Sequence, residues 1–237
     1  MKHLCLIAAL FSSFASAQET SDRWQFSFTP YLWLAGVKGS TAAGGSEPPD
    51  LDPDYNFFAL DNLEAVMFLN FAMSKNRWTL ETDALYINFA DNFDVGPVNT
   101  NIDLKGSAIE LSVGYKPAGW DYAEVIFGAR RLQIDIDIEL TPGLDGADGQ
   151  AWVDPIVGMR YIRPVSNRWD AILRADVGGF GVSSDFTFNA FAAARYRFGD
   201  TFSMLFGFRH LAFDFKEDDF IADLQIDGFL VGFNFIF

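Results

Sequence analysis

The last ten residues of the chain, 228–237, alternate large apolar side chains with small or polar ones and end on a phenylalanine. Successive side chains of a β-strand point to opposite faces, so Phe229, Phe233 and Phe237 share one face. A strand of about 9–11 residues with apolar side chains outward and polar side chains inward is what a membrane-spanning barrel requires. This pattern therefore predicts a transmembrane β-strand at the end of the chain.

The two ends of the chain carry patterns typical of export to the outer membrane. A basic start precedes an apolar stretch over residues 4–14, and residues 15–17 (Ala-Ser-Ala) have the small side chains that precede signal-peptidase cleavage. We expect residues 1–17 to be a cleaved signal peptide and residues 18–237 to form one outer-membrane β-barrel domain. The final Phe237 resembles the C-terminal assembly signal of bacterial outer-membrane proteins, so we expect the barrel-assembly machinery to be a partner.

The composition favours a closed barrel over a helical membrane protein. Half of all residues are hydrophobic and 26 are Phe, yet no apolar run after residue 17 approaches the roughly 18 residues of a membrane helix. Such a chain can enter a bilayer only as a closed sheet, because lipid cannot satisfy an open sheet edge. A soluble all-β sandwich in the periplasm is the competing class. The single cysteine, Cys5, lies in the expected signal peptide, so no thiol chemistry is expected in the mature chain.

The alternation of apolar and polar residues predicts an all-β fold, a closed antiparallel up-and-down transmembrane β-barrel. We count ten strands, with eight or twelve as alternatives. Tight turns follow the even-numbered strands and longer connections the odd-numbered ones, as expected for short periplasmic turns and long external loops. The predicted external loops include residues 37–62, 91–101, 141–149 and 216–223, and they are rich in polar or acidic residues.

Three local features refine this prediction. Pro30 cannot donate to a strand ladder, which indicates a bulge or an edge position. The alternation predicts a change of phase near Arg130 and Arg131, so a β-bulge is expected there, with Leu132 and Ile134 facing lipid beyond it. Aromatic residues just beyond four of the tight turns, such as Trp78 on the third strand, predict an interfacial aromatic girdle.

Charged side chains of both signs are predicted on the inward face. Ten strands make a narrow barrel whose interior side chains can fill, and an unpaired charge in such a space costs several kcal/mol. We therefore expect an arginine–carboxylate network that holds the barrel's shape, with a narrow polar pore lined by these charges as the alternative. The residues assigned to this network are Glu64, Glu81, Asp83, Glu110, Asp154, Arg160, Arg174, Asp176, Arg195, Arg197, Arg209 and Asp227.

The net charge of −15 limits the possible partners. Nucleic-acid binding needs a basic surface, so it is not expected. Acidic loops at a bacterial surface stay solvated or bridge to lipopolysaccharide through divalent cations. Outer-membrane lipid and lipopolysaccharide are the expected surroundings of a monomeric barrel.

Two short motifs resemble known ligand-binding motifs only weakly. Residues 178–181 (Gly-Gly-Phe-Gly) lack the lysine and the following helix of a phosphate-binding loop. We therefore expect these glycines to allow a bend in the strand or to leave room for a neighbouring aromatic ring. Residues 50–54 carry alternate carboxylates but lack the central glycine and closing glutamate of a calcium loop. No cofactor and no metal site is predicted.

His210 is the only histidine outside the expected signal peptide. A lipid-modifying enzyme would need this histidine with a serine or carboxylate, and Asp214 shares its strand face. By phase, however, His210 joins the aromatic row of Phe206 and Phe208, which favours a place in the interfacial girdle. No catalytic residue is therefore predicted.

Three segments, residues 153–160 (VDPIVGMR), 174–186 (RADVGGFGVSSDF) and 207–211 (GFRHL), resemble a family of proteobacterial outer-membrane β-barrel proteins whose members are mostly hypothetical or porin-like. The resemblance covers roughly the C-terminal half. It implies the fold and location derived above and brings no catalytic residue, and His210 stands where a tyrosine is expected. A structural or surface-interaction role is the leading expectation, followed by a narrow porin-like channel and then a lipid-modifying enzyme.

Overall fold

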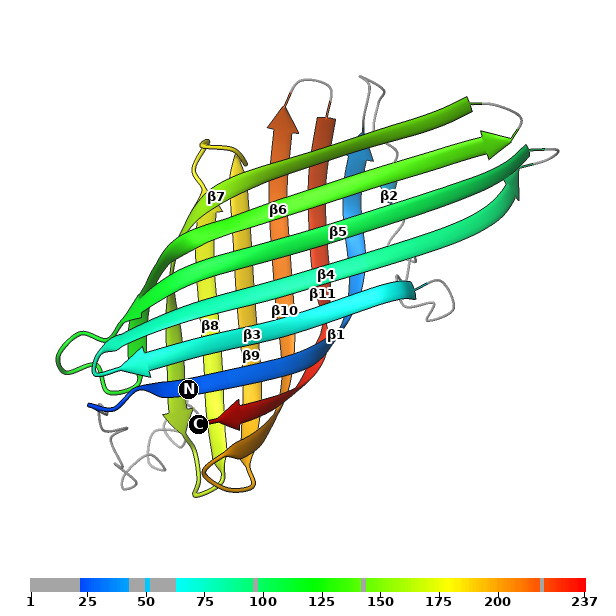
Figure 1. Cartoon of the computed structure of the whole chain (residues 1–237). Helices are drawn as coiled ribbons and strands as arrows, with labels where there is room; N and C mark the ends of the chain where they lie inside the picture. Colours follow the sequence, from blue (N-terminus) through cyan, green and yellow to red (C-terminus); the bar gives the residue numbers. More distant parts are fainter. Residues whose placement is uncertain (1–21, 43–49, 52–62, 96–97, 142–143, 218–219) are drawn as a thin grey trace, which may run out of the picture.

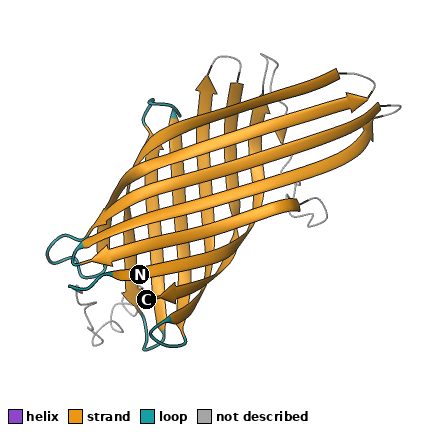
Figure 2. Cartoon of the chain, viewed as in Figure 1, coloured by secondary structure: helices purple, strands orange, loops and turns teal. Residues whose placement is uncertain are grey.

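The computed structural model describes residues 22–42, 50–51, 63–95, 98–141, 144–217 and 220–237. These residues form one antiparallel sheet that closes on itself, because β11 pairs with β1 (Figure 1). Figure 2 shows strands and connecting turns in this part of the chain, and within it no helix is long and apolar enough to cross a membrane. The strands are β1 (Gln25–Ala42), β2 (Asp50–Leu51), β3 (Leu63–Lys75), β4 (Trp78–Val95), β5 (Val98–Tyr115), β6 (Ala123–Thr141), β7 (Leu144–Pro164), β8 (Trp169–Gly179), β9 (Phe186–Arg197), β10 (Phe202–Glu217) and β11 (Phe220–Ile236).

The barrel wall consists of ten long strands, as predicted, and β2 adds a two-residue pairing to β1. In β8 exposed and buried side chains alternate, with Trp169 and Leu173 outward and Asp170, Arg174 and Asp176 inward. This period of two follows from the pleat of a strand. The inward polar and outward apolar pattern read from the sequence is confirmed over this part of the wall.

Tight turns join β3 to β4, β5 to β6, β7 to β8 and β9 to β10, and they lie at the end of the barrel that holds both termini (Figure 1). We call this the turn end and the opposite end the loop end. Asn76 has a φ of 55° and Gly119 a φ of 83°; asparagine and glycine tolerate this left-handed region. The residues expected at these turns therefore make them.

The strands reach further toward the loop end than the sequence predicts. Only residues 96–97 separate β4 from β5, only 142–143 separate β6 from β7, and only 218–219 separate β10 from β11. The predicted loops 91–101, 141–149 and 216–223 are thus mostly strand. These segments are rich in Gly, Asp and Asn, which are depleted in strands, so their composition favours loops.

Near the loop end the wall divides into two sheets. Pairing between β1 and β3 ends at Pro30, opposite Leu69, and β1 continues beside β11. On the other side, β8 and β9 stop at Gly179 and Phe186, so β7 and β10 extend past them. Figure 1 shows β3–β7 running obliquely across β10, β11 and the upper part of β1. The predicted edge position of Pro30 is confirmed.

The two sheets pack face to face on an apolar cluster. Trp152 of β7 stacks on Phe215 of β10, with ring centroids 4.1 Å apart, and meets Phe213 edge-on. The buried members of the cluster are Trp33, Ala35, Phe68, Ala108, Leu132, Ile134, Trp152, Leu211, Phe213, Phe215, Phe220, Ala222, Leu224 and Leu230. Above the barrel proper, the fold is therefore a sandwich with its own core.

The predicted phase change in β6 is wrong. Its register with β5 and β7 is continuous across Arg130 and Arg131, without a bulge. Leu132 and Ile134 are 4% and 8% exposed and face inward. Their apolar character reflects the core of the sandwich rather than contact with lipid, so the inner face of β6 changes from polar to apolar along its length.

Candidate functional site

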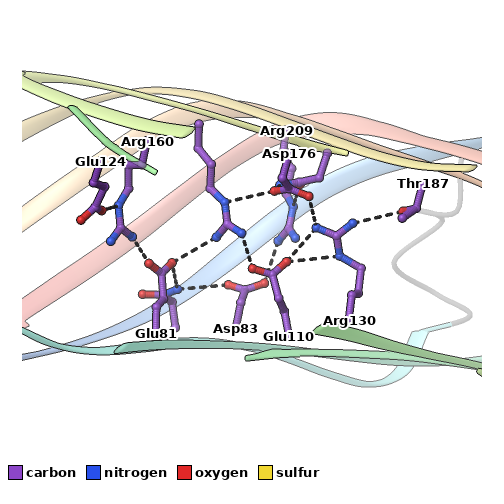
Figure 3. Close-up of polar contacts among 12 residues, drawn as sticks. Glu81, Asp83, Glu110, Glu124, Arg130, Arg160, Asp176, Thr187 and Arg209 are labelled. Atoms are coloured by element: carbon purple, nitrogen blue, oxygen red, sulfur yellow. Dashed lines mark hydrogen bonds and ion pairs between the residues drawn. The ribbon is translucent and has the colours of Figure 1, made fainter. Parts of the chain in front are cut away.

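A layer of ion pairs crosses the middle of the lumen. Figure 3 shows arginines and carboxylates from different strands pointing toward one another. Arg174 of β8 lies near its centre: Nη1 is 3.3 Å from Glu81, Nε donates to Asp176 at 3.2 Å, and Nη2 bonds Glu110. One guanidinium therefore connects three carboxylates, two of them from β4 and β5 across the lumen.

Arg130 forms the boundary of this layer toward the loop end. Its Nη2 lies 2.7 Å from Glu110 and 2.6 Å from Asp176, and its Nη1 donates to the Thr187 hydroxyl at 3.1 Å. The side chain of Arg130 is only 1% exposed. A buried arginine is tolerated when its donors are satisfied, and these contacts supply carboxylates from two strands.

Arg209 of β10 joins the opposite part of the wall to the layer. Its Nη1 is 2.9 Å from Asp83 and 3.0 Å from the Tyr31 hydroxyl, while its Nε donates to Asn189 at 2.9 Å. The guanidinium also lies over the ring of Trp33 at 5.2 Å. This residue thus connects the charge layer to the apolar cluster above it.

Arg160 of β7 completes the layer toward the turn end, where it bonds both Glu81 and Glu124. Among the described side chains, four arginines and five carboxylates make up the connected layer: Arg130, Arg160, Arg174 and Arg209 with Glu81, Asp83, Glu110, Glu124 and Asp176. Mutual pairing lowers the cost of burying these charges.

Other predicted network residues lie outside this layer. Asp154 is buried and faces inward, but it accepts bonds from the Ser184 backbone N–H at 2.8 Å and the Ser184 hydroxyl at 2.6 Å. Arg195 and Arg197 lie near the turn end and pair with Asp170 at 2.8 and 3.4 Å. These residues make separate, local contacts.

The inward assignment of Asp227 is wrong. Even-numbered residues of β11 such as Gly228 and Leu230 are buried inside, whereas Asp227 faces outward and bonds His210 on β10. The predicted outward position of His210 is therefore consistent with the structure, but its carboxylate partner is Asp227 rather than Asp214. The side chain of Glu64 lies outside the described residues.

Three charged residues of the lumen, among the described ones, were missed by sequence reasoning: Glu124, Arg130 and Asp170. All three are buried and face inward. The supposed phase change in β6 made the orientation of Arg130 ambiguous. If Val125 and Phe127 face outward, the alternation places Glu124 inward. In the same way, an outward Trp169 places Asp170 inward.

A cavity of about 300 Å³ opens from the turn end and reaches the charge layer. Its lining includes Lys75, Lys116 and Tyr122 near the mouth and Glu81, Arg160 and Arg174 at the base. Leu230, a member of the apolar cluster, also lines the cavity, so the cluster begins where the cavity ends. The lumen is thus blocked first by paired charges and then by packed apolar side chains.

The described residues hold no group of three or more His, Cys, Asp or Glu side chains that could bind a metal ion. Most of the weak calcium motif at 50–54 lies outside the described residues. Gly179 and Gly181 adopt positive φ values of 85° and 69° in the turn from β8 to β9, which fits the backbone role expected for these glycines.

No protein-family model and no curated protein sequence matches the chain. Among solved structures, it is similar to the outer membrane protease OmpT from Escherichia coli, with a TM-score of 0.51 and 6% identity over 91% of this chain and 97% of that one. It is also similar to Ail from Yersinia pestis (TM-score 0.39, 9% identity, 90% of this chain and 98% of that one). A third match is Neisserial surface protein A (TM-score 0.36, 10% identity, 89% and 96%). At these identities, the likeness to OmpT establishes the fold of an outer-membrane-type β-barrel and carries no activity with it.

Proposed function

We propose that this chain is an outer-membrane protein that acts at the cell surface through its external sheets and does not pass solutes. The observation that carries this proposal is the double closure of the lumen. Arg174 and its three carboxylates fill the mid-section, and the stacked rings of Trp152 and Phe215 fill the section above. A pore would need both layers to open.

The proposed orientation places the turn end in the periplasm and the loop end outside, following the usual asymmetry of bacterial barrels. The outer wall supports a lipid-facing belt, since large apolar side chains such as Leu111, Phe127 and Leu173 are more than half exposed. In this orientation the sandwich formed by β3–β7 and by β10, β11 and β1 stands above the membrane. Lipid and lipopolysaccharide then surround a monomer.

Single-channel recording tests the proposal. Purified protein, refolded in detergent and shown to be folded by its heat-dependent gel mobility, is added to planar lipid bilayers. We expect no discrete conductance steps, because paired charges and packed rings block the path. Discrete steps in the wild-type protein would refute a closed lumen. Separately, recovery of the mature chain without detergent in the periplasmic fraction would refute the membrane location.

A narrow channel is the second candidate, and the cavity of about 300 Å³ at the turn end, whose lining includes charged side chains, is the observation that favours it. Such a channel would need the charge layer to rearrange. If wild-type protein does give steps, Arg160→Gln should shift their cation-to-anion selectivity, because Arg160 lies at the base of the cavity. Steps with unchanged selectivity would place the conducting path elsewhere.

A further inference from the structure

The wall of the sandwich has an opening above the β8–β9 hairpin. Below this hairpin tip, β8 and β9 occupy two positions in the sheet between β7 and β10. Pairing of β7 to β8 begins at Ile156, opposite Gly178, although β7 starts at Leu144. Neighbouring strands are about 4.8 Å apart, so two strand positions above the tip hold no strand among the described residues.

The backbone of β7 presents hydrogen-bonding groups to this opening. The N–H of Ile162 donates to Tyr122 ahead of β6, and the direction alternates along an antiparallel strand. Even-numbered residues of β7 therefore bond to β6, and odd-numbered residues point the other way. Above β8 these include Pro155, Val153 and Ala151.

The base of the opening is closed by the β8–β9 turn. The Ser183 hydroxyl donates to the Val153 carbonyl at 3.0 Å, and the Asp185 N–H donates to the Asp214 carbonyl of β10 at 2.9 Å. Above this point, no backbone partner of the Val153 N–H or of Ala151 is present on this side in the described part of the chain. Val153 is 48% exposed, so this edge is accessible.

The edge is held in place from inside. Trp152, the neighbour of both residues, stacks on Phe215. Gln150 donates to Glu217 of β10 at 2.9 Å. The extended backbone of β7 is thus fixed before any partner arrives, which lowers the entropy cost of adding a strand.

Carboxylates outnumber cations around the edge. Asp185, Asp214 and Glu217 lie on the β10 side, and Asp135 is on the neighbouring strand β6, opposite Gly149. Arg131 of β6 lies opposite Val153 and donates to Gln133. Lys216 is engaged by Asp214 at 3.1 Å, and the pKa of its ammonium is raised because it donates a hydrogen bond to that carboxylate. The remaining negative charge complements a cationic partner.

We propose that the free edge of β7 at Ala151 and Val153 binds an extended, basic polypeptide segment by adding it as a strand. Backbone bonds to β7 supply the affinity, and the surrounding carboxylates select lysine- or arginine-containing segments. This inference rests on the proposed surface role, since it names the partner class and the place where it binds.

The test uses the full mature protein folded in detergent and a fluorescent peptide in which lysine and valine alternate. We expect saturable binding in fluorescence anisotropy. Ala151→Pro should weaken it about tenfold or more, because it removes one amide donor and places a ring in the path of the incoming strand. The substitution spares the pairing of β7 with β6, and Pro155 already occupies the same row.

Ala118→Pro is the matched control. Ala118 precedes Gly119 in the turn closed by the bond from Trp120 to Pro117, where a proline fits, and binding should be unchanged. On wild-type protein, a peptide with alternate amides N-methylated should lose binding, and amide exchange at Ala151 should slow with the unmodified peptide. If the methylated peptide binds as tightly as the unmodified one, the interaction depends on charge alone and the proposal is wrong. The proposal is also wrong if folded Ala151→Pro binds the unmodified peptide as tightly as the wild-type protein does, or if the wild-type protein does not bind it. None of these outcomes alters the conductance test above.

Discussion

Arg209 on β10 and Asp83 on β4 form an ion pair of 2.9 Å across the lumen. In the sheet, β10 and β4 are separated by β11, β1 and β3 on one side and by β5–β9 on the other, so the pair joins opposite walls. The Tyr31 hydroxyl lies within 3.1 Å of both side chains. This ion pair connects parts of the chain that come together only when the barrel is closed, so it stabilises the closed form.

Replacing Arg209 with Met should destabilise the protein strongly. Asp83 would remain buried without its cation, and breaking a buried pair in this way costs about 3–5 kcal/mol. The free energy of unfolding is measured by urea titration of the detergent-folded protein, followed by tryptophan fluorescence. Adding Asp83→Leu should recover part of the loss, because the unpaired charge is then removed.

Arg197→Met serves as the control for this effect. Arg197 is 36% exposed and shares Asp170 with Arg195, so its loss should cost less than about 1 kcal/mol. If Arg197→Met lowers the free energy of unfolding as much as Arg209→Met does, the charge layer does not stabilise the closed barrel.

Thiol labelling tests the orientation of β6. The mature chain is expected to lack cysteine, so Arg131→Cys and Leu132→Cys each introduce a single thiol. Arg131 is exposed and bonds Gln133 on the outer face, whereas Leu132 is 4% exposed inside the sandwich. A membrane-impermeant maleimide on intact cells should label position 131 and leave position 132 unlabelled. The reverse pattern would restore the β-bulge that the sequence suggested.

The barrel itself was predictable because its determinants are local. In β8, side chains that contact lipid in the proposed orientation alternate with charged ones, as in Trp169, Arg174 and Asp176. The period of two then assigns each residue to a face without knowledge of its partners. Seven of the network residues predicted in this way are buried inside the barrel, among them Glu81, Glu110 and Arg209.

The loop end was not predictable, because its inner face is apolar as well. For Leu132 and Ile134, a sequence cannot distinguish an inward face packed on Phe213 and Phe215 from an outward face against lipid. The pairing of specific arginines with carboxylates depends on how strands far apart in sequence face one another, as Arg174 and Glu81 do. Neither kind of information is present in a local pattern.

The enzyme hypothesis predicts a role for His210 that a simple substitution can test. His210 bonds Asp227 on the outer wall, both side chains are 28% exposed, and its ring lies 5.7 Å from that of Phe188. We expect His210→Asn to leave lipid A and phospholipid profiles of the cells unchanged in mass spectrometry. A changed profile, restored by wild-type protein, would instead make His210 a catalytic candidate.

Closure of the barrel at the β1–β11 seam predicts a sharp difference between two glycines. Gly228 lies opposite Ala35, and a Cβ atom there would overlap the Leu34 carbonyl oxygen, a backbone atom that cannot move alone. The Gly228 carbonyl also accepts the indole N–H of Trp33 at 3.2 Å. Gly228→Ala should therefore force the seam apart and lower the free energy of unfolding by about 1–3 kcal/mol.

Gly36, the next residue along the same seam, has open space where its Cβ would lie. Gly36→Ala should leave stability unchanged or raise it slightly, since alanine loses less backbone entropy than glycine on folding. Both variants are compared by the urea concentration at half-unfolding in the same detergent. A matching loss in the two variants would mean that close backbone approach at Gly228 does not limit the seam, and that β1 and β11 pair more loosely than their continuous register implies.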